Sequence, residues 1–278
     1  MGIRSRFSMI VTYGTLTVLT VVWLIPLATV AMSSLRPQDE IRAGWWNLRS
    51  ATFTFQNYVE AWNQGLSEFV VNSLIITLLS VCLTVVAGTL AAYAFARLSF
   101  RFKNVSYFLL ITTMIVPVQL ILIPLLPWFR TLGFDAGAFE PYLGIALVHT
   151  AFGAGWAVFM ITSFLNELPE EIIEAARIDG AGHFDLFRRI VVPLAVPGIV
   201  SFAIIDFIFV WNDLLLALTL LGREFQPLTV GLANLQSPHL AQDDLVSAGA
   251  MMAILPPLLL FVALNRYYVR GLFAGSER

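Results

Sequence analysis

Long uncharged stretches alternate with short polar segments along this chain. Five stretches contain no Asp, Glu, Lys or Arg, at 7–35, 69–96, 104–129, 141–166 and 245–265, and a sixth, at 196–221, is interrupted only by Asp206 and Asp213. Each is longer than the ~20 residues that an α-helix needs to cross about 30 Å of hydrocarbon. The pattern predicts an all-α polytopic membrane protein, one domain over 1–278, with six spans at about 9–33, 70–96, 105–128, 142–165, 196–221 and 246–267.

The first stretch is predicted to stay in the protein as a signal-anchor. It follows Arg4 and Arg6, as the apolar region of a secretory signal does. Its uncharged run is far longer than the 7–15 residues of such a region, and no clear small-residue cleavage site ends it.

Basic residues orient the predicted spans. With the N-terminus inside, the inner segments hold 11 Lys and Arg residues and the outer segments hold 5. Because cytoplasmic loops carry the excess of Lys and Arg, both termini are expected in the cytoplasm.

Composition excludes several classes of function. Apolar residues make up 58% of the chain and charged residues 12%, which is too few charges to cover a water-soluble enzyme. The net charge of −2 argues against nucleic-acid binding. The only lysine, Lys103, follows no glycine-rich loop, so the chain holds no P-loop of its own, and the lone Cys82 excludes an intrachain disulfide. No metal site is expected.

The outer segment 36–68 is rich in aromatic residues. Two interpretations stay open, anchoring of the rings at the membrane interface and a docking surface for an external protein. The residues are Trp45, Trp46, Phe53, Phe55, Tyr58 and Trp62.

The loop 166–195 between the fourth and fifth spans is the most polar inner segment. Pro169, Glu170 and Glu171 suit a first helical turn, and Gly180 and Gly182 suit a stop, so a helix of about ten residues is predicted after Pro169. A second helix is expected from about 184 to 191, with a break at Pro193.

One face of the predicted loop helix suits a partner. Ile172, Ala175, Ala176 and Asp179 are spaced i, i+3, i+4 and i+7, and the two alanines would let another backbone approach closely. A helix this short is marginal alone. The simpler alternative is an amphipathic loop that lies on the membrane surface.

A spaced series of residues in this loop resembles the EAA motif of binding-protein-dependent ABC importer permeases. It is Glu174-Ala175-Ala176, then Gly180 after three residues, then Ile190 after nine more and Val192-Pro193, where the family pattern has leucine in place of Val192. The chain also resembles the carbohydrate-uptake branch, in particular the smaller six-span permease of maltose and α-glucoside importers. The matching stretches, within about 33–275, are 53–58, 72–73, 92–97, 211–213, 227–232 and 266–272, whereas the end at 274–278 departs from the branch's glycine-lysine-glycine-like tail.

The resemblance implies a coupling mechanism. A second permease subunit, two ATP-binding subunits and an external sugar-binding protein are implied as partners, with ATP and Mg on the ATP-binding subunits and no cofactor or catalytic residue in this chain. The loop helix would sit in a cleft of an ATP-binding subunit and move with it, which would turn the spans from inward-open to outward-open. The residues implied in this coupling are Glu170, Glu171, Ile172, Glu174, Ala175, Ala176, Asp179, Gly180 and Ala181.

Polar residues inside the spans are candidates for a substrate pathway. Asp206 and Asp213 are seven residues apart and are expected on one side of the fifth span, facing the protein interior or a water-filled cavity. Each could instead join interhelical hydrogen bonds. The full candidate set is Asn72, Ser73, Gln119, Asp206, Trp211, Asn212 and Asp213.

Two other functions compete with the importer hypothesis. An autonomous ion-coupled transporter could use Asp206 and Asp213, although we find no inverted repeat. An intramembrane enzyme would need facing carboxyl groups, whereas two residues seven apart on one helix are on the order of 10 Å apart along its axis. The sugar itself is not defined by the sequence, with α-glucosides as the expected class.

Overall fold

The computed structural model describes residues 3–44, 46–47, 51–235 and 242–273, with side chains within 8–267. Within this part of the chain every regular element is a helix. Five helices are long and apolar enough to cross a membrane, and a sharply bent pair would make a sixth span. The predicted fold class, an all-α protein with several membrane-spanning helices, is confirmed.

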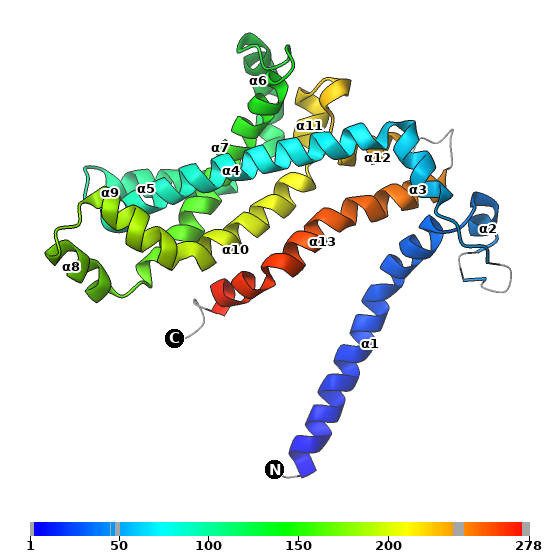
Figure 1. Cartoon of the computed structure of the whole chain (residues 1–278), viewed down its shortest axis with the longest axis horizontal. Helices are drawn as coiled ribbons and strands as arrows, with labels where there is room; N and C mark the ends of the chain where they lie inside the picture. The colour runs from blue at the N-terminus through cyan, green and yellow to red at the C-terminus, as the bar shows by residue number, and fades with distance from the viewer. Residues whose placement is uncertain (1–2, 45, 48–50, 236–241, 274–278) are drawn as a thin grey trace. The chain divides into compact units, whose positions relative to one another are not determined.

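The helices form two compact units. Unit 1 comprises residues 1–67 and 231–255. It contains α1 (Ile3–Ser34), α2 (Gln38–Arg42), α3 (Gln56–Ala61), the π-helical turn η1 (Trp62–Leu66) and the first part of α13 (Asp243–Phe273) (Figure 1). The side chains of α1 from Ser8 to Ala28 are exposed, as expected of an apolar helix that lies in lipid.

Unit 2 comprises residues 68–230 and 256–278. Its long helices are α4 (Ser67–Arg97), α7 (Glu140–Asn166) and α10 (Val192–Trp211). Small residues let these helices approach closely, because a Cβ added at Gly88 of α4 would lie 2.3 Å from the Cβ of Ala157 on α7.

The predicted third span is a broken helix. It consists of α5 (Lys103–Thr112), the 3₁₀ turn η2 (Thr113–Ile115) and α6 (Val118–Thr131), and the two halves meet at 100°. Pro117 lies at the break, where it offers no N–H, and the preceding Val116 is extended with ψ 116°. One continuous helix over 105–128 is therefore wrong, and the third span itself stays a prediction.

The predicted fifth span is shorter than expected. The helix α10 ends at Trp211, and α11 (Leu215–Leu220), η4 (Arg223–Phe225) and α12 (Leu228–Leu235) follow as separate short helices. Because Asp213 lies beyond the end of α10, the expectation that Asp206 and Asp213 share one face of a single helix is wrong.

The predicted break at Pro193 is also absent. The chain is helical from His183 to Trp211 through α9 (His183–Leu186), the π-helical turn η3 (Phe187–Val191) and α10. Pro193 lies in the first turn of α10. The π turn changes the backbone hydrogen bonding just before this proline, so the missing N–H does not end the helix.

Candidate functional site

The helix α8 (Glu170–Ile178) forms in the polar loop where the sequence predicts it. Gly180 follows with φ 87°, a left-handed conformation that suits glycine. Its N–H donates to the carbonyl of Arg177 at 3.0 Å, and the N–H of Ala181 donates to the carbonyl of Ala176 at 3.0 Å. This is a Schellman motif, and it ends the helix as the glycine predicts.

The buried stripe of α8 differs from the predicted face. Ile173 and Ala176 pack into the core of unit 2. Ile172 and Ala175 are exposed, as is Asp179 at the end of the helix. The four residues predicted to share one environment do not, because the stripe that unit 2 covers is centred between Ile173 and Ala176.

The outward surface of α8 is both acidic and apolar. Glu170, Glu171 and Glu174 are exposed, and Ile172 and Ile178 are 42% and 85% exposed. Exposed isoleucines beside three carboxylates are typical of a surface that a partner covers.

The end of α4 holds α8 and α9 in place. Arg97, with a side chain only 8% exposed, forms an ion pair with Glu170 and donates to the carbonyl of Leu165 at 2.6 Å. Tyr93, one turn earlier, donates to the carbonyl of His183 at 3.1 Å. Sequence reasoning missed both contacts, although an arginine and a tyrosine at the end of an uncharged stretch were available as signals.

A polar cluster lies inside unit 2 among α4, α7 and α10. Asp206 is 5% exposed. A Cβ added at Gly153 would lie 2.8 Å from Cγ2 of Thr84 and 3.2 Å from Oδ1 of Asp206, so the glycine brings these side chains together. Thr84 also lies 3.4 Å from the hydroxyl of Thr150. The predicted location of Asp206 in the protein interior is thus observed.

Asp213 organises the turn after α10. Its carboxylate accepts hydrogen bonds from the N–H groups of Leu216 at 3.2 Å and Ala217 at 3.0 Å, which satisfies the first amides of α11. Nε2 of His149 on α7 lies 3.8 Å from the same carboxylate. Asp213 is therefore a local capping residue with a histidine neighbour.

The other residues of the predicted pathway differ in exposure. Trp211 is 3% exposed and stacks on Phe207 with ring centroids 5.7 Å apart, so its ring is covered. Asn212 is exposed and donates to the carbonyl of Ile208 at 2.7 Å. Gln119 is exposed in the first turn of α6, directly after the 100° bend.

Asn72 and Ser73 connect α4 to the segment between α11 and α12. The amide of Asn72 donates to the carbonyls of Glu224 at 2.8 Å and Gln226 at 3.0 Å. The hydroxyl of Ser73 accepts the N–H of Leu228 at 2.8 Å. Both side chains are buried in unit 2, where they hold this segment in place.

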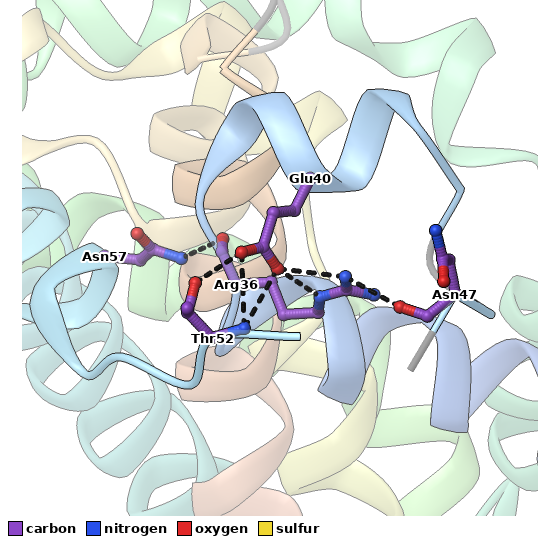
Figure 2. Close-up of polar contacts among 5 residues, drawn as sticks. All are labelled: Arg36, Glu40, Asn47, Thr52 and Asn57. Atoms are coloured by element: carbon purple, nitrogen blue, oxygen red, sulfur yellow. Dashed lines mark hydrogen bonds and ion pairs between the residues drawn. The ribbon is translucent and has the colours of Figure 1, made fainter. Parts of the chain in front are cut away.

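In unit 1, a polar network organises the segment after α1 (Figure 2). The buried Arg36 donates to Glu40 at 2.9 Å and to the carbonyl of Asn47 at 3.0 Å. Glu40 also accepts the N–H and the hydroxyl of Thr52, and the hydrogen bond from that hydroxyl is the main cause that lowers the pKa of Glu40. Asn57 donates to the carbonyls of Ser34 at 3.0 Å and Arg36 at 2.9 Å.

Four of the aromatic residues of the outer segment have exposed rings: Trp46, Phe53, Phe55 and Trp62. Tyr58 is only partly exposed, and its hydroxyl hydrogen-bonds that of Ser34 at 2.8 Å. Trp45 lies outside the described residues. The network around Arg36 thus supports a segment that carries exposed rings, and both interpretations of those rings remain predictions.

Taken together, the apolar helices, the polar cluster within them and the helical loop define a polytopic membrane protein with a structured polar loop. Residues 84–273 match the model of one family, the inner membrane components of binding-protein-dependent transport systems. The chain belongs to this family.

Relatives and solved structures agree with this assignment. The chain is 38% identical to the osmoprotective compounds uptake permease protein GgtD of Synechocystis sp., over 92% of this chain and 88% of that protein. It is 39% identical to the alpha-glucoside transport system permease protein AglG of Rhizobium meliloti, over 81% of this chain and 60% of that protein. In fold it resembles a chain of a bacterial ABC transporter involved in the import of alginate, with a TM-score of 0.80 at 20% identity over 96% of this chain and 99% of that one.

The resemblance to ABC importer permeases is therefore confirmed. The chain is a multi-pass protein of the inner membrane and a permease subunit, not an enzyme. ATP hydrolysis belongs to partner subunits. The divergent tail at 274–278 lies outside the described residues, as do residues 236–241.

Proposed function

We propose that this chain is one of two permease subunits in an ATP-driven importer of a sugar or oligosaccharide, with α-glucosides as the expected substrate class. One relative at 39% identity, from Rhizobium meliloti, is named as a permease of an alpha-glucoside transport system, which supports this class. The other subunits are a second, related permease, two ATP-binding subunits that hold ATP and Mg, and an external sugar-binding protein.

Coupling to the ATP-binding subunits runs through α8, and the exposed surface of this helix carries the proposal. Glu171 and Glu174 suit a basic cleft on the partner, while Glu170 holds the start of α8 to Arg97. Ile172 contributes apolar contact area. Ala175 and Asp179 lie on the exposed part of the helix, where the small alanine allows close approach. The Schellman motif at Ala176, Gly180 and Ala181 sets the direction in which the chain leaves the helix.

We assign to the cytoplasm the ends of the spans that carry most of the basic residues, together with both termini. Arg97 and Lys103 flank the link between α4 and α5, and Arg177, Arg188 and Arg189 lie on α8 and η3. These basic residues therefore belong to the side of the membrane on which α8 meets the ATP-binding subunit.

The candidate residues of the substrate pathway fall into two groups, those with exposed side chains and those with enclosed ones. Gln119 and Asn212 have exposed side chains, so they are available to a passing solute. The enclosed residues hold the helices and turns that shape the path. They are Asn72, Ser73, Asp206, Trp211 and Asp213.

Affinity purification of this chain from gently solubilised membranes tests the proposal. We expect recovery of one related permease and an ATP-binding subunit, with the latter lost when Glu174→Lys reverses a charge on α8. Glu167→Lys, an exposed residue just before α8, is the matched control and should retain the ATP-binding subunit. Purification of the chain alone, or only with itself, would contradict the proposal.

Transport measurements test coupling directly. We expect Glu174→Lys and Gly180→Asp to abolish sugar uptake while ATP hydrolysis continues and the protein remains in the membrane. Gly180→Asp acts through the left-handed backbone, since its φ is 87°. Normal uptake in both variants would exclude α8 as the coupling helix, and uptake driven by an ion gradient without the ATP-binding subunits would favour an autonomous transporter.

A further inference from the structure

A cavity of about 700 Å³ lies at the end of α4, beside the link to α5 and under α8 and α9. Its basic lining residues are Arg97, Lys103, Arg177 and His183, and its apolar lining includes Leu98 and Phe100. All of these residues belong to unit 2. The coupling proposed for α8 uses the outward surface of that helix and does not use this cavity.

Among the described residues, the basic side chains that line the cavity outnumber the carboxylates in contact with them. Glu170 pairs with Arg97 and lies 4.0 Å from Arg177, so within the described part of the chain a single carboxylate faces two guanidinium groups. Lys103 donates to the carbonyl of Leu98 at 3.0 Å, a bond that orients the ammonium group without neutralising it. The cavity is therefore suited to an anion.

The position of the cavity indicates where the anion comes from. Arg97 is the last residue of α4 and Lys103 the first of α5, so the cavity lies where two apolar helices leave and re-enter the membrane. Leu98 and Phe100 add apolar surface next to the cations. Basic pockets between membrane helices on the cytoplasmic side are suited to anionic lipids, whose phosphate binds cations and whose acyl chains pack on apolar surface.

We propose that this cavity binds the phosphate group of an anionic phospholipid from the cytoplasmic leaflet. Lys103 and Arg177 contact the phosphate, and Arg97 keeps its structural bonds to α8. The proposal rests on the orientation given under the proposed function. A bound lipid would fill the space between the α4–α5 link and α8, and so support the helix that meets the ATP-binding subunit.

Native mass spectrometry of the intact importer in nanodiscs tests this proposal. The complex is compared in phosphatidylcholine discs that contain or lack phosphatidylglycerol, and retained lipid is counted after release. We expect retained phosphatidylglycerol on the native complex and about thirtyfold weaker retention in Lys103→Gln/Arg177→Gln, from the usual contribution of two cations near an anionic lipid surface. The conservative variant Lys103→Arg/Arg177→Lys keeps both charges and should keep the lipid.

Arg188→Gln/Arg189→Gln is the matched control, because both residues are exposed on η3 and the change in net charge is the same. Equal loss in both double variants would show only a general surface charge effect, and unchanged retention would exclude the cavity; either result overturns the proposal. Inorganic phosphate is titrated in discs without phosphatidylglycerol, and if it bound as well as the lipid did, the lipid source would be excluded. Lipid retention does not depend on transport, so failure here is distinguishable from failure of the importer proposal, which the capture of ATP-binding subunits tests.

Discussion

Asp206 and Asp213 show how strongly local backbone structure decides what a carboxylate does. From spacing alone they form a pair on one helix face. In the structure Asp206 lies on α10, whereas Asp213 follows the end of that helix and accepts the first amide hydrogens of α11. The sequence could not separate these roles, because the same apolar pattern continues past Trp211 without a glycine or proline to mark the end of the helix.

At the residue scale, the network around Glu40 predicts a pH dependence. Hydrogen bonds from Thr52, together with Arg36, lower the pKa of Glu40 below its ordinary value. The ionised carboxylate therefore stabilises the folded segment at pH above that ordinary value, and the contribution is lost as the pH falls through the lowered pKa. We expect the protection of the Thr52 amide, measured as its hydrogen exchange rate relative to the intrinsic rate at the same pH, to fall on acidification across this range.

Glu40→Gln is the variant that isolates this effect. It retains the shape of the side chain but cannot ionise, so the protection of the Thr52 amide should be lower at neutral pH and nearly independent of pH. Asp39→Asn, an exposed neighbour on α2, is the control and should behave like the native protein. Unchanged protection of this amide in the native protein between neutral and acidic pH would contradict the assignment.

At the element scale, the contact between α4 and α7 depends on the absence of a side chain at Gly88. Gly88→Ala would place a methyl group 2.3 Å from the Cβ of Ala157, so the helices would have to separate. We expect a destabilisation of about 1–3 kcal/mol, the usual cost of overpacking a close contact, measured as a lower midpoint of thermal unfolding of the purified protein.

Gly14→Ala provides the matched control. A Cβ at Gly14 on α1 would meet nothing within 4 Å, and alanine has the higher helix propensity. The midpoint should stay unchanged or rise slightly. Equal destabilisation by both substitutions would show that backbone flexibility, not the contact with Ala157, determines the result.

Element positions were largely predictable, whereas element shapes were not. Uncharged runs locate the long helices, and Gly180 locates the end of α8, because these follow from local rules of hydrophobicity and backbone conformation. Local rules predict a helix break at Pro117 and at Pro193 alike. The structure has a 100° bend at the first and a continuous helix through the second, because the outcome depends on the neighbouring turns. The contacts of Tyr93 and Arg97 join residues about 70–90 positions apart, a separation that no local pattern reveals.

At the scale of the whole molecule, Arg97 links the long helix α4 to the helix proposed to meet the ATP-binding subunit. Its ion pair with Glu170 and its bonds to the carbonyls of Leu165 and Leu168 gather the start of α8 and the end of α7 at one side chain. A nearly buried guanidinium with several acceptors is costly to remove.

We expect Arg97→Ala to reduce sugar uptake at least tenfold while the importer still assembles and hydrolyses ATP, because movement of α8 would no longer be passed to α4. Uptake and hydrolysis are measured on the same proteoliposomes. Arg97→Lys should recover only part of the uptake, since an ammonium group cannot reproduce the geometry of the guanidinium. Loss of assembly in Arg97→Ala would show that the residue is needed for stability, and full uptake would exclude the link.

Asn57 anchors the C-terminal end of α1, and this anchor limits how the first span can move. One amide group binds the carbonyls of Ser34 and Arg36, so the end of the helix is tied to a residue more than twenty positions further along the chain. A helix held in this way can tilt about that end, whereas sliding along its own axis would break both hydrogen bonds at once. Any piston-like stroke of the first span would have to carry α3 with it, whereas a swing of its opposite end would leave this anchor intact.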